Sequence, residues 1–299
     1  MDIPSLLILA AGQGSRYGSL KSADPVGPNG ESLVDYSIYD ACRAGFGKIV
    51  FVIRVEMEQA FCELISSHLT RRIKVEFVYQ EPGKLPSQFP LPAGRTRPWG
   101  TTHAVLMAAP AIREPFGVIN AHDFYGADSY RALARHLSSG STDFAVMGYV
   151  LRNTLPEIVP VARGVCAVDE NGYLRHIDEL KYVEREGGHA RSIDPSGAET
   201  RLTGNETVSM NMWGFTPEAF GLLRSEFQHF LEQHGSDLAA ECALPNSLSN
   251  LVAAAKARVK VLHCAESCFG VTYRADHAMA VHAIRQGIEG GYYPKHLWG

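Results

Sequence analysis

The most constraining feature of the sequence is a continuous apolar run, residues 5–11, that leads directly into a loop rich in glycine, serine and proline. An apolar run without polar alternation is typical of a strand that is covered on both faces, as in parallel sheets. Glycines placed directly after such a strand let backbone N–H groups approach an anion closely. The start of the chain therefore predicts a buried strand with an anion-binding loop at its carboxyl end.

Strand and helix patterns alternate over residues 1–150. Apolar runs predict further strands at residues 48–54, 74–80, 116–120 and 143–151. Amphipathic stretches predict helices at residues 32–44, 55–69, 105–111 and 129–138. This alternation predicts an α/β fold with a mostly parallel central sheet, right-handed crossovers and helices on both faces. In such folds, ligands bind beyond the carboxyl ends of the strands.

The second half of the chain has a more mixed pattern. Two short β runs within residues 165–177 flank Asn171-Gly172, which is a strong hairpin signal. Further elements are predicted at 208–215 and 258–264 (strands) and at 217–234, within 239–257 and at 276–287 (helices). Residues 82–99 contain five prolines, and a loop of this length is usually a lid or a binding loop.

Charge and cysteine usage exclude some classes of protein. A net charge of -4 argues against a dedicated nucleic-acid-binding protein, because phosphate contacts need a basic surface. No apolar stretch is long enough to cross a membrane. The first residues lack the basic segment of a signal peptide. The spacing of the six cysteines suggests no disulfide framework, which predicts thiols in a reducing, cytoplasmic compartment.

Two cations accompany the glycines of the first loop, at Arg16 and Lys21. Such a loop suits a triphosphate, whose negative charge rises as a bond to phosphorus changes. The G-x-x-x-x-G-K-[ST] pattern of a Walker loop is absent. A dinucleotide fingerprint fits poorly, because the third glycine, Gly18, comes one residue late and the following prolines prevent a helix. A purely structural glycine turn is the alternative.

The same loop resembles that of the nucleoside-diphosphate-sugar pyrophosphorylases, which are sugar-phosphate nucleotidyltransferases. The resemblance rests on L-A-A-G-Q-G-S-R-Y-G-S-L-K (residues 9–21), on Pro25-Val26 and on G-E-S-L (residues 30–33). It implies a Rossmann-like, GT-A-like nucleotidyltransferase fold in one domain of residues 1–299. It also implies that a nucleoside triphosphate and a sugar 1-phosphate give an NDP-sugar and pyrophosphate, with Mg²⁺ as cofactor. Residues 1–150 would bind the nucleotide, and residues 151–299 would bind the sugar or other acceptor.

The resemblance also implies roles for individual residues of the first half. The nucleotide-binding residues would be Ala10, Ala11, Gly12, Gly14, Ser15, Gln80, Gly100 and Thr101. Arg16 would hold the leaving pyrophosphate, and Lys21 or Lys181 would draw in the attacking phosphate. Gln80 is otherwise a polar strand end, and Thr101 or Thr102 could also serve as a helix N-cap.

A metal ligand is expected where the strand at 116–120 ends. The resemblance assigns this role to Asp123, and Mg²⁺ prefers carboxylate oxygens together with phosphate and water. On one alignment His122 takes the aspartate position, and imidazole is a poor Mg²⁺ ligand. Many family members have a second metal aspartate where this chain has Gly270. The alternative for Asp123 is a loop or capping carboxylate.

Acceptor-binding residues are expected at Glu179, Lys181 and Asn211. A carboxylate at Glu179 can accept two sugar hydroxyls, although in the family glutamate is followed directly by lysine, whereas here Leu180 intervenes. The alternative is a surface salt bridge. Asn211 lies in an apolar run, and a buried amide is costly without a partner. It therefore contacts either the ligand or a structural partner.

Other functions are compatible with these patterns. Nucleotidyl transfer to a non-sugar phosphate monoester is one, and a non-catalytic nucleotide or sugar-nucleotide sensor is another, which His122 and Gly270 favour. An NAD-dependent oxidoreductase is disfavoured by the glycine spacing. Members of the family often form dimers or tetramers, so the resemblance is also compatible with a homo-oligomer.

Overall fold

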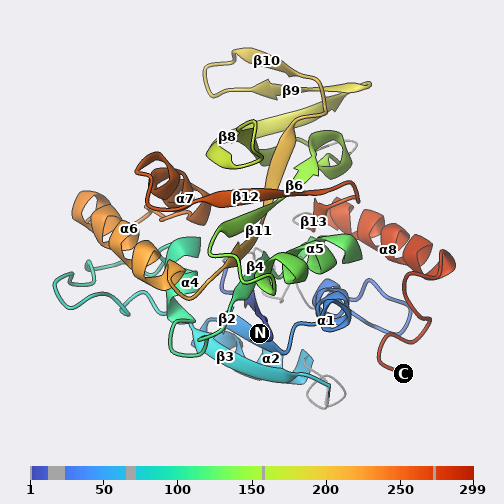
Figure 1. Ribbon diagram of the computed structural model, residues 1–299, viewed down its shortest axis with the longest axis horizontal. Helices are drawn as coiled ribbons and strands as arrows, with labels where there is room; N and C mark the ends of the chain where they lie inside the picture. The colour runs from blue at the N-terminus through green and yellow to red at the C-terminus, as the bar shows by residue number, and fades with distance from the viewer. Residues whose placement is uncertain (1, 13–23, 65–71, 157–158, 272–273) are drawn as a thin grey trace.

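The structure is a computed structural model that describes residues 2–12, 24–64, 72–156, 159–271 and 274–299. In this part of the chain, the strands form one 11-stranded mixed sheet and a separate two-stranded sheet (Figure 1). The strands of the large sheet are β1 (Ser5–Leu9), β2 (Lys48–Ile53), β3 (Lys74–Tyr79), β4 (Phe116–Asn120), β6 (Phe144–Val150), β7 (Val161–Val168), β8 (Leu174–Glu186), β9 (His189–Ile193), β10 (Glu199–Leu202), β11 (Thr207–Phe215) and β12 (Val259–Cys264). The small sheet pairs β5 (Asp123–Phe124) with β13 (Phe269–Gly270).

Helices cover both faces of the large sheet. They are α1 (Leu33–Ala44), α2 (Glu58–Leu64), α4 (Thr101–Met107), α5 (Ala127–Leu137), α6 (Ala219–His234), α7 (Leu244–Ala253) and α8 (Arg274–Glu289), with the 3₁₀ turns η2 (Val55–Met57) and η3 (Leu151–Thr154). None of the helices in the described ranges has the length and apolarity needed to cross a lipid bilayer.

The predicted parallel sheet is present in the first half of the chain. β4, β1, β2 and β3 lie side by side and run parallel, so their carboxyl ends meet at one edge of the sheet. β11 then continues the sheet antiparallel to β4, and β7 to β10 extend it further as antiparallel neighbours. The Rossmann-like α/β fold is thus confirmed, within a sheet that is mixed as a whole.

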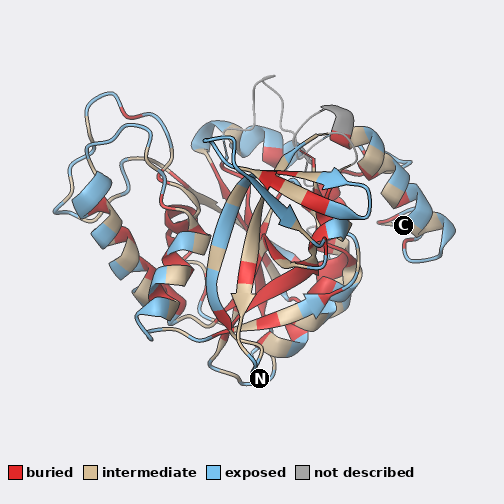
Figure 2. Ribbon diagram, turned by 90° about the horizontal axis from the view of Figure 1, so that it is seen from above, coloured by how far each residue is buried: buried red, intermediate tan, exposed pale blue. Residues whose placement is uncertain are grey.

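Side-chain alternation along β1 explains the continuous apolar run. Leu6 and Ile8 enter the core beneath α1 and α5, whereas Leu7 and Leu9 enter the core beneath α4, α6 and α7. Successive side chains of a strand point to opposite faces, so a strand that is covered on both faces must be apolar throughout. Figure 2 shows this buried interior and the largely exposed antiparallel extension.

The first helix begins and ends as its sequence predicts. The hydroxyl of Ser32 accepts a hydrogen bond from the backbone N–H of Asp35, and the Asp35 carboxylate accepts from the Ser32 N–H at 2.8 Å. This capping box satisfies two N–H groups that would otherwise lack partners. The helix ends at Gly45, whose φ of 98° is the left-handed conformation that glycine adopts readily.

The hairpin predicted around Asn171-Gly172 joins β7 and β8, and Gly172 has a φ of 76°. The strands β9 and β10 were not predicted. Together with the outer part of β8 they form the extension at the top of Figure 1. Many of their side chains are exposed, so they lack the apolar run by which a buried strand is identified.

The proline-rich segment, residues 82–99, is held against the chain that follows α6. The guanidinium of Arg95 donates to the carbonyl oxygens of Asp237 at 2.6 Å and Ala240 at 2.7 Å, and it stacks 3.3 Å from the ring centroid of Trp99. The indole N–H of Trp99 in turn donates to the carbonyl of Pro82. Arg95 and Trp99 are both buried, so these contacts fix the loop in place.

Candidate functional site

An open cavity of about 530 Å³ lies at the carboxyl end of β4 and beside β7, β8 and β11. It contains four of the residues expected to bind metal or acceptor, together with two charged residues that were not predicted there. These lining residues are Asp123, Glu179, Lys181, Asn211, Arg163 and Asp276. The cavity thus brings together side chains that are more than 150 residues apart in the sequence.

The Asp123 carboxylate is buried, with 5% of the residue exposed, and its two oxygens have different surroundings. Oδ2 accepts hydrogen bonds from the side-chain amide of Asn120 at 2.8 Å and from the hydroxyl of Tyr125 at 3.2 Å. Oδ1 lies 3.6 Å from Nε2 of His122, a half-exposed side chain that also lines the cavity. One oxygen is therefore fixed by two donors, and the described residues leave the other for a ligand.

Asn211 continues this network behind the cavity. Its amide nitrogen donates to Oδ1 of Asn120 at 2.8 Å, and its Oδ1 accepts from the indole N–H of Trp213 at 2.7 Å. Asn211 has a φ of 61°, and it lies where β11 shifts register between Ser209 and Trp213. Asparagine tolerates this left-handed conformation better than most residues. The predicted structural partner of Asn211 is therefore present, and the residue also borders the cavity.

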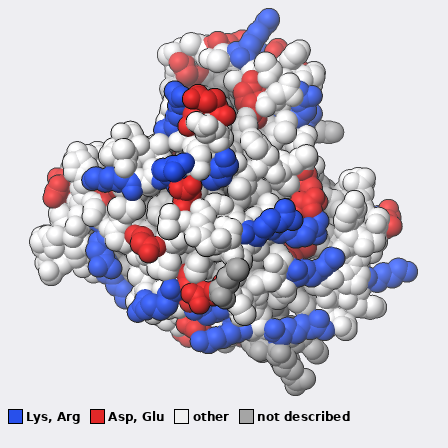
Figure 3. All heavy atoms as spheres, in the orientation of Figure 1, with Lys and Arg blue, Asp and Glu red and all other residues white. Residues whose placement is uncertain are grey.

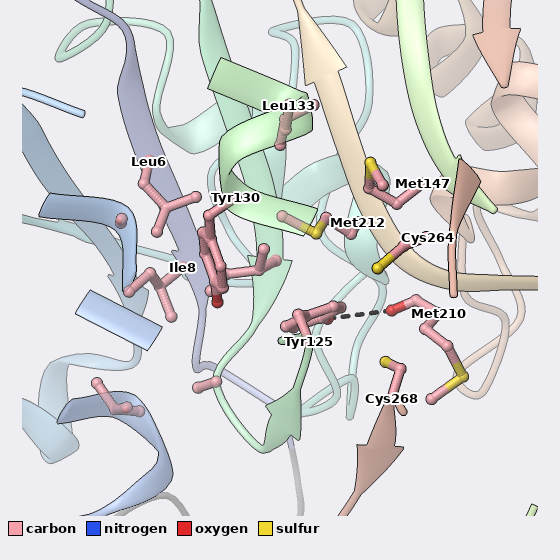
Figure 4. Packing of buried hydrophobic residues seen from close by; sticks show 14 of the residues in the cluster. Leu6, Ile8, Tyr125, Tyr130, Leu133, Met147, Met210, Met212, Cys264 and Cys268 are labelled. Atoms are coloured by element: carbon pink, nitrogen blue, oxygen red, sulfur yellow. Dashed lines mark hydrogen bonds between the residues drawn. The ribbon is translucent and has the colours of Figure 1, made fainter. Parts of the chain in front are cut away.

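Tyr125 supports the same carboxylate from the apolar core. Burial raises the pKa of Tyr125 well above its ordinary value, and the negative charge of Asp123 acts in the same direction, so the phenol keeps its proton. Its hydroxyl also lies 3.0 Å from the carbonyl oxygen of Met210 (Figure 4). Sulfur-bearing side chains, among them Cys268 and Met212, surround this tyrosine. Tyr125 is thus a neutral hydrogen-bond donor in an apolar setting.

Gly270 is paired directly with Asp123 in the small sheet. The position at which many family members have an aspartate therefore faces Asp123 but has no side chain. Among the described residues, no three His, Cys, Asp or Glu side chains are grouped so that they could hold a metal ion by themselves. Mg²⁺ is usually bound by one or two carboxylates and completed by substrate phosphates and water. The remaining Asp123 oxygen fits such an ion if the substrate supplies most of the ligands.

The acceptor side of the cavity is built on the pairing of β7 with β8. Gly164 lies opposite Glu179, and Lys181 follows on the same face of β8 because side chains alternate along a strand. Both Glu179 and Lys181 are exposed. Within the described ranges, no ion pair joins them, so the salt-bridge interpretation of these two residues has no support in the structure.

Four of the residues expected to bind the nucleotide lie at the carboxyl ends of β1 and β3. Ala10, Ala11 and Gly12 follow β1, and the backbone N–H of Ala10 still bonds to β2. Gln80 follows β3, two strand spacings away, or about 10 Å. Gly14, Ser15, Arg16 and Lys21 lie outside the described residues.

Gln80 and Gly100 are bonded to each other. The buried side-chain amide of Gln80 donates to the carbonyl oxygen of Gly100 at 2.9 Å. Gly100 is the residue that precedes α4, with a φ of 92°, and Thr101 is the first residue of the helix. The Thr101 hydroxyl accepts from the backbone N–H of Leu244 at 2.8 Å, so it bonds to the start of α7 and does not cap its own helix.

Sequence reasoning missed four residues of the site: Asn120, Tyr125, Arg163 and Asp276. Asn120 and Tyr125 flank the predicted metal aspartate, and a polar residue at the end of a buried strand was a usable signal for the former. Arg163 is a mostly buried cation on β7, and its only signal was its position next to Gly164.

Comparisons with known proteins agree with this geometry. The family model described as "Nucleotidyl transferase" matches residues 5–182. No curated protein matches the chain. Three similar solved structures are an inositol-1-phosphate CTP transferase from T. maritima (14% identity, TM-score 0.63, covering 95% of this chain and 97% of that one), a UDP-glucose pyrophosphorylase complexed with UDP-glucose (16%, 0.62, 95% and 99%) and a putative glucose-1-phosphate thymidylyltransferase from Bacillus anthracis (13%, 0.64, 94% and 95%).

At these identities the solved structures show the fold, and the family model shows the relationship. The matched residues make up more than half of the chain and include the glycine-rich loop, Asp123 and Glu179. The chain therefore belongs to the nucleotidyl transferase family.

Proposed function

We propose that this protein joins a nucleoside triphosphate to a sugar 1-phosphate and releases pyrophosphate. The observation that carries the proposal is the cavity that Asp123 shares with Glu179, Lys181 and Asn211. Asp123 follows β4, which lies directly beside β1, so the cavity adjoins the strand that leads into the glycine-rich loop. A triphosphate on that loop would have its phosphates next to a site that can hold an acceptor.

The two halves of the chain would divide the work. Residues 1–150 would bind the nucleotide, with Gln80 and the turn at Gly100 near the base and the backbone of residues 10–12 near the phosphates. Arg16 would hold the leaving pyrophosphate. Residues 151–299 would bind the acceptor, with Glu179 accepting hydrogen bonds from sugar hydroxyls and Lys181 or Lys21 attracting its phosphate.

The reaction would be a direct displacement at phosphorus. A phosphate oxygen of the acceptor attacks the α-phosphorus, and the bond between the α- and β-phosphates breaks as the new P–O bond forms. Positioning and charge stabilisation would dominate, so no covalent intermediate on the protein is needed. Asp123 would hold Mg²⁺ through Oδ1, with its orientation set by Asn120 and Tyr125. When bound, Mg²⁺ supplies positive charge that neutralises the phosphates.

A second candidate is transfer to a non-sugar phosphate monoester. The solved inositol-1-phosphate CTP transferase covers nearly all of this chain, and its named substrate is a cyclic polyol phosphate. The carboxylate of Glu179 could accept hydrogen bonds from polyol hydroxyls as readily as from those of a sugar. Both acceptors share a phosphate monoester with neighbouring hydroxyl groups.

The test is pyrophosphate release with Mg²⁺, in which the common triphosphates are crossed with a panel of sugar 1-phosphates, inositol 1-phosphate and simple phospho-alcohols. Release with one sugar 1-phosphate supports the proposal and identifies both substrates. Release only with a non-sugar phosphate favours the second candidate. If a triphosphate binds, as judged by thermal shift, but no pair releases pyrophosphate, the result favours either an acceptor outside the panel or a sensor, for which Gly270 is the structural argument.

A further inference from the structure

Arg163 is a mostly buried cation whose position is fixed by the chain around it. Its Nε donates to the Thr154 hydroxyl at 2.9 Å, one terminal nitrogen donates to the Thr154 carbonyl, and the other donates to the Ala162 carbonyl at 2.7 Å. Thr154 lies in η3, so the guanidinium is clamped between that turn and its own strand. All three acceptors are neutral oxygens.

Among the described residues, the positive charge of Arg163 has no direct ionic partner. In the described part of the chain, no carboxylate oxygen lies within 4.0 Å of its nitrogens. Burial lowers the pKa of Arg163, and the negative charges of Asp123 and Asp276 act in the opposite direction. The guanidinium is therefore close enough to Asp123 and Asp276 to feel their charge, but not in contact with them. An arginine stays protonated in proteins, so this site holds a permanent charge.

Arg163 also has hydrogen-bonding capacity to spare. A guanidinium has five N–H groups, and the three contacts use one on each nitrogen. In contacts with the described residues, one N–H remains on each terminal nitrogen. Arg163 is one of the residues that line the cavity. Paired guanidinium N–H groups match the oxygens of a phosphate, and this geometry makes arginine a selective phosphate ligand.

The neighbours of Arg163 indicate which phosphate would bind. Arg163 precedes Gly164, which is paired with Glu179, and it lies within electrostatic reach of Asp123. Its side chain projects from the face of β7 opposite to Glu179, because Arg163 pairs with Leu180, but Arg163, Glu179 and Asp123 all line the same cavity. The triphosphate would approach from the other side, where β1 and β3 end.

We propose that Arg163 binds the phosphate group of the acceptor, in addition to the lysines expected from the family resemblance. The identity of the acceptor rests on the proposed function, but the binding of a phosphate monoester does not. The clamp by Thr154 holds the guanidinium ready before the ligand arrives, so that little conformational entropy is lost on binding.

The chain offers a matched control in Arg185. The guanidinium of Arg185 also bonds to the η3 region, through the carbonyl oxygens of Arg152 at 2.8 Å and Leu155 at 3.1 Å, but it does not line the cavity. Replacing Arg185 removes a charge and two backbone contacts next to the same turn. Any loss that follows from weakening the turn itself should be common to both substitutions.

The experiment measures binding of inorganic phosphate and of glucose 1-phosphate to the full chain by calorimetry and ³¹P NMR, for the wild type and for Arg163→Ala, Arg163→Lys and Arg185→Ala. Thermal unfolding shows which variants are folded. We expect Arg163→Ala to weaken phosphate binding by about 10- to 100-fold, as for loss of hydrogen bonds to a charged group. Arg185→Ala should bind like the wild type. Added guanidinium ion at millimolar concentration should restore binding to Arg163→Ala, and urea at the same concentration should not.

Two results would overturn the proposal: unchanged phosphate affinity in Arg163→Ala, or equal losses in Arg163→Ala and Arg185→Ala. If Arg163→Ala does not fold, the phosphate affinity of Arg163→Lys tests the proposal, because lysine keeps the charge but lacks the paired N–H groups. A phosphate affinity of Arg163→Lys that is several-fold weaker then supports the proposal, and unchanged affinity refutes it.

Failure of the proposed function would give a different result, because the wild type would release no pyrophosphate while phosphate binding still depended on Arg163. In an active enzyme, KM for the acceptor should rise and KM for the triphosphate should stay the same.

Discussion

The side-chain amides of Asn120 and Asn211 share a hydrogen bond of 2.8 Å, although the two residues are 91 positions apart in the sequence. Through this bond the indole N–H of Trp213 is linked to the carboxylate of Asp123 by way of two asparagines. Each amide in the series accepts with its oxygen and donates with its nitrogen. The carboxylate expected to hold the metal is thus oriented from a strand that also borders the acceptor side of the cavity.

Replacement of Asn211 should destabilise the protein, and comparison of two variants separates the causes. Asn211→Ala and Asn211→Gly both leave the buried Trp213 N–H without its acceptor, which should cost about 1–3 kcal/mol of unfolding free energy. Alanine, unlike glycine, is also strained at a φ of 61°, which should lower the free energy of unfolding by a further roughly 1–2 kcal/mol. Urea unfolding should rank wild type above Asn211→Gly and Asn211→Gly above Asn211→Ala. Equal stability of all three proteins would contradict the role assigned to this hydrogen bond.

The pairing of Gly270 with Asp123 leads to a prediction about metal affinity. Residues directly opposite each other in an antiparallel pair project to the same face, with Cβ atoms about 4.5–5.5 Å apart. Gly270→Asp would therefore place a second carboxylate within reach of an ion held by Asp123. We expect Mn²⁺, used as a paramagnetic probe for Mg²⁺, to bind at least about 10-fold more tightly by EPR titration.

The control for this metal measurement is Gly270→Asn, which has nearly the same volume as the aspartate variant but no charge. It should strengthen Mn²⁺ binding much less. Equal affinity of both variants would mean that the effect comes from the shape of the site, and an aspartate variant that binds like the wild type would show that Asp123 does not hold the ion.

Much of the fold could be predicted from the sequence, because its strongest signals are local. The run at residues 5–11 is apolar on both faces, and the capping pair at Ser32 and Asp35 marks the start of a helix. The antiparallel extension was missed because exposed strands lack that apolar pattern. β8, for example, has mostly exposed or partly exposed side chains along its 13 residues.

The site could be predicted only in part, for a different reason. Asp123, Glu179 and Asn211 were found through family resemblance, and the cavity includes all three. Asn120 was missed because its partner Asn211 is brought beside it only by folding, and Arg163 was missed because the register of β7 and β8 brings it to the cavity. Hydrophobic periodicity predicts that a strand exists, but it contains no information about which residue of a distant strand lies beside it.

The pH dependence of stability should be dominated in one range by Asp40 on α1. This carboxylate is 2% exposed; its Oδ2 accepts from the Tyr293 hydroxyl at 2.8 Å, and its Oδ1 has no partner in the described part of the chain. Burial raises the pKa of Asp40 to about 7, against the hydrogen bond from Tyr293, which lowers it. In the unfolded chain the pKa returns to its ordinary value of 3.8.

The direction of the effect follows from proton binding. Between pH 4 and pH 7 the unfolded chain has released the Asp40 proton and the folded protein still holds it, so the free energy of unfolding falls as the pH rises. The full change is roughly 4 kcal/mol, for a shift of about three pH units. Asp40→Asn should remove this fall, and urea unfolding from pH 5 to pH 8 measures it. Asp194→Asn is the control, because Asp194 is exposed and its pKa is lowered, so it stays ionised over this range in both states. An Asp40→Asn variant with the wild-type slope would contradict the prediction.

Gly100 should tolerate no side chain, and Gly94 provides the comparison that explains why. Both glycines have positive φ, 92° and 82°, so alanine at either position should cost about 1–2 kcal/mol through backbone strain. A Cβ at Gly100 would also lie 2.6 Å from the carbonyl oxygen of Cys242, whereas at Gly94 the nearest atom, on Leu238, is 3.9 Å away. Overpacking against backbone should add roughly 1–3 kcal/mol for Gly100→Ala alone.

The difference between these two alanine variants therefore measures how closely the start of α4 packs against the segment that leads into α7. Because the carbonyl oxygen of Gly100 accepts from the side chain of Gln80, a displaced turn should also weaken triphosphate binding. We expect Gly100→Ala to lose both stability, in urea unfolding, and nucleotide affinity, in a fluorescence titration, while Gly94→Ala loses only the smaller amount of stability. If both variants lose the same stability and keep the wild-type nucleotide affinity, the close contact with Cys242 is not a constraint, and Gln80 with Gly100 is not part of the nucleotide site.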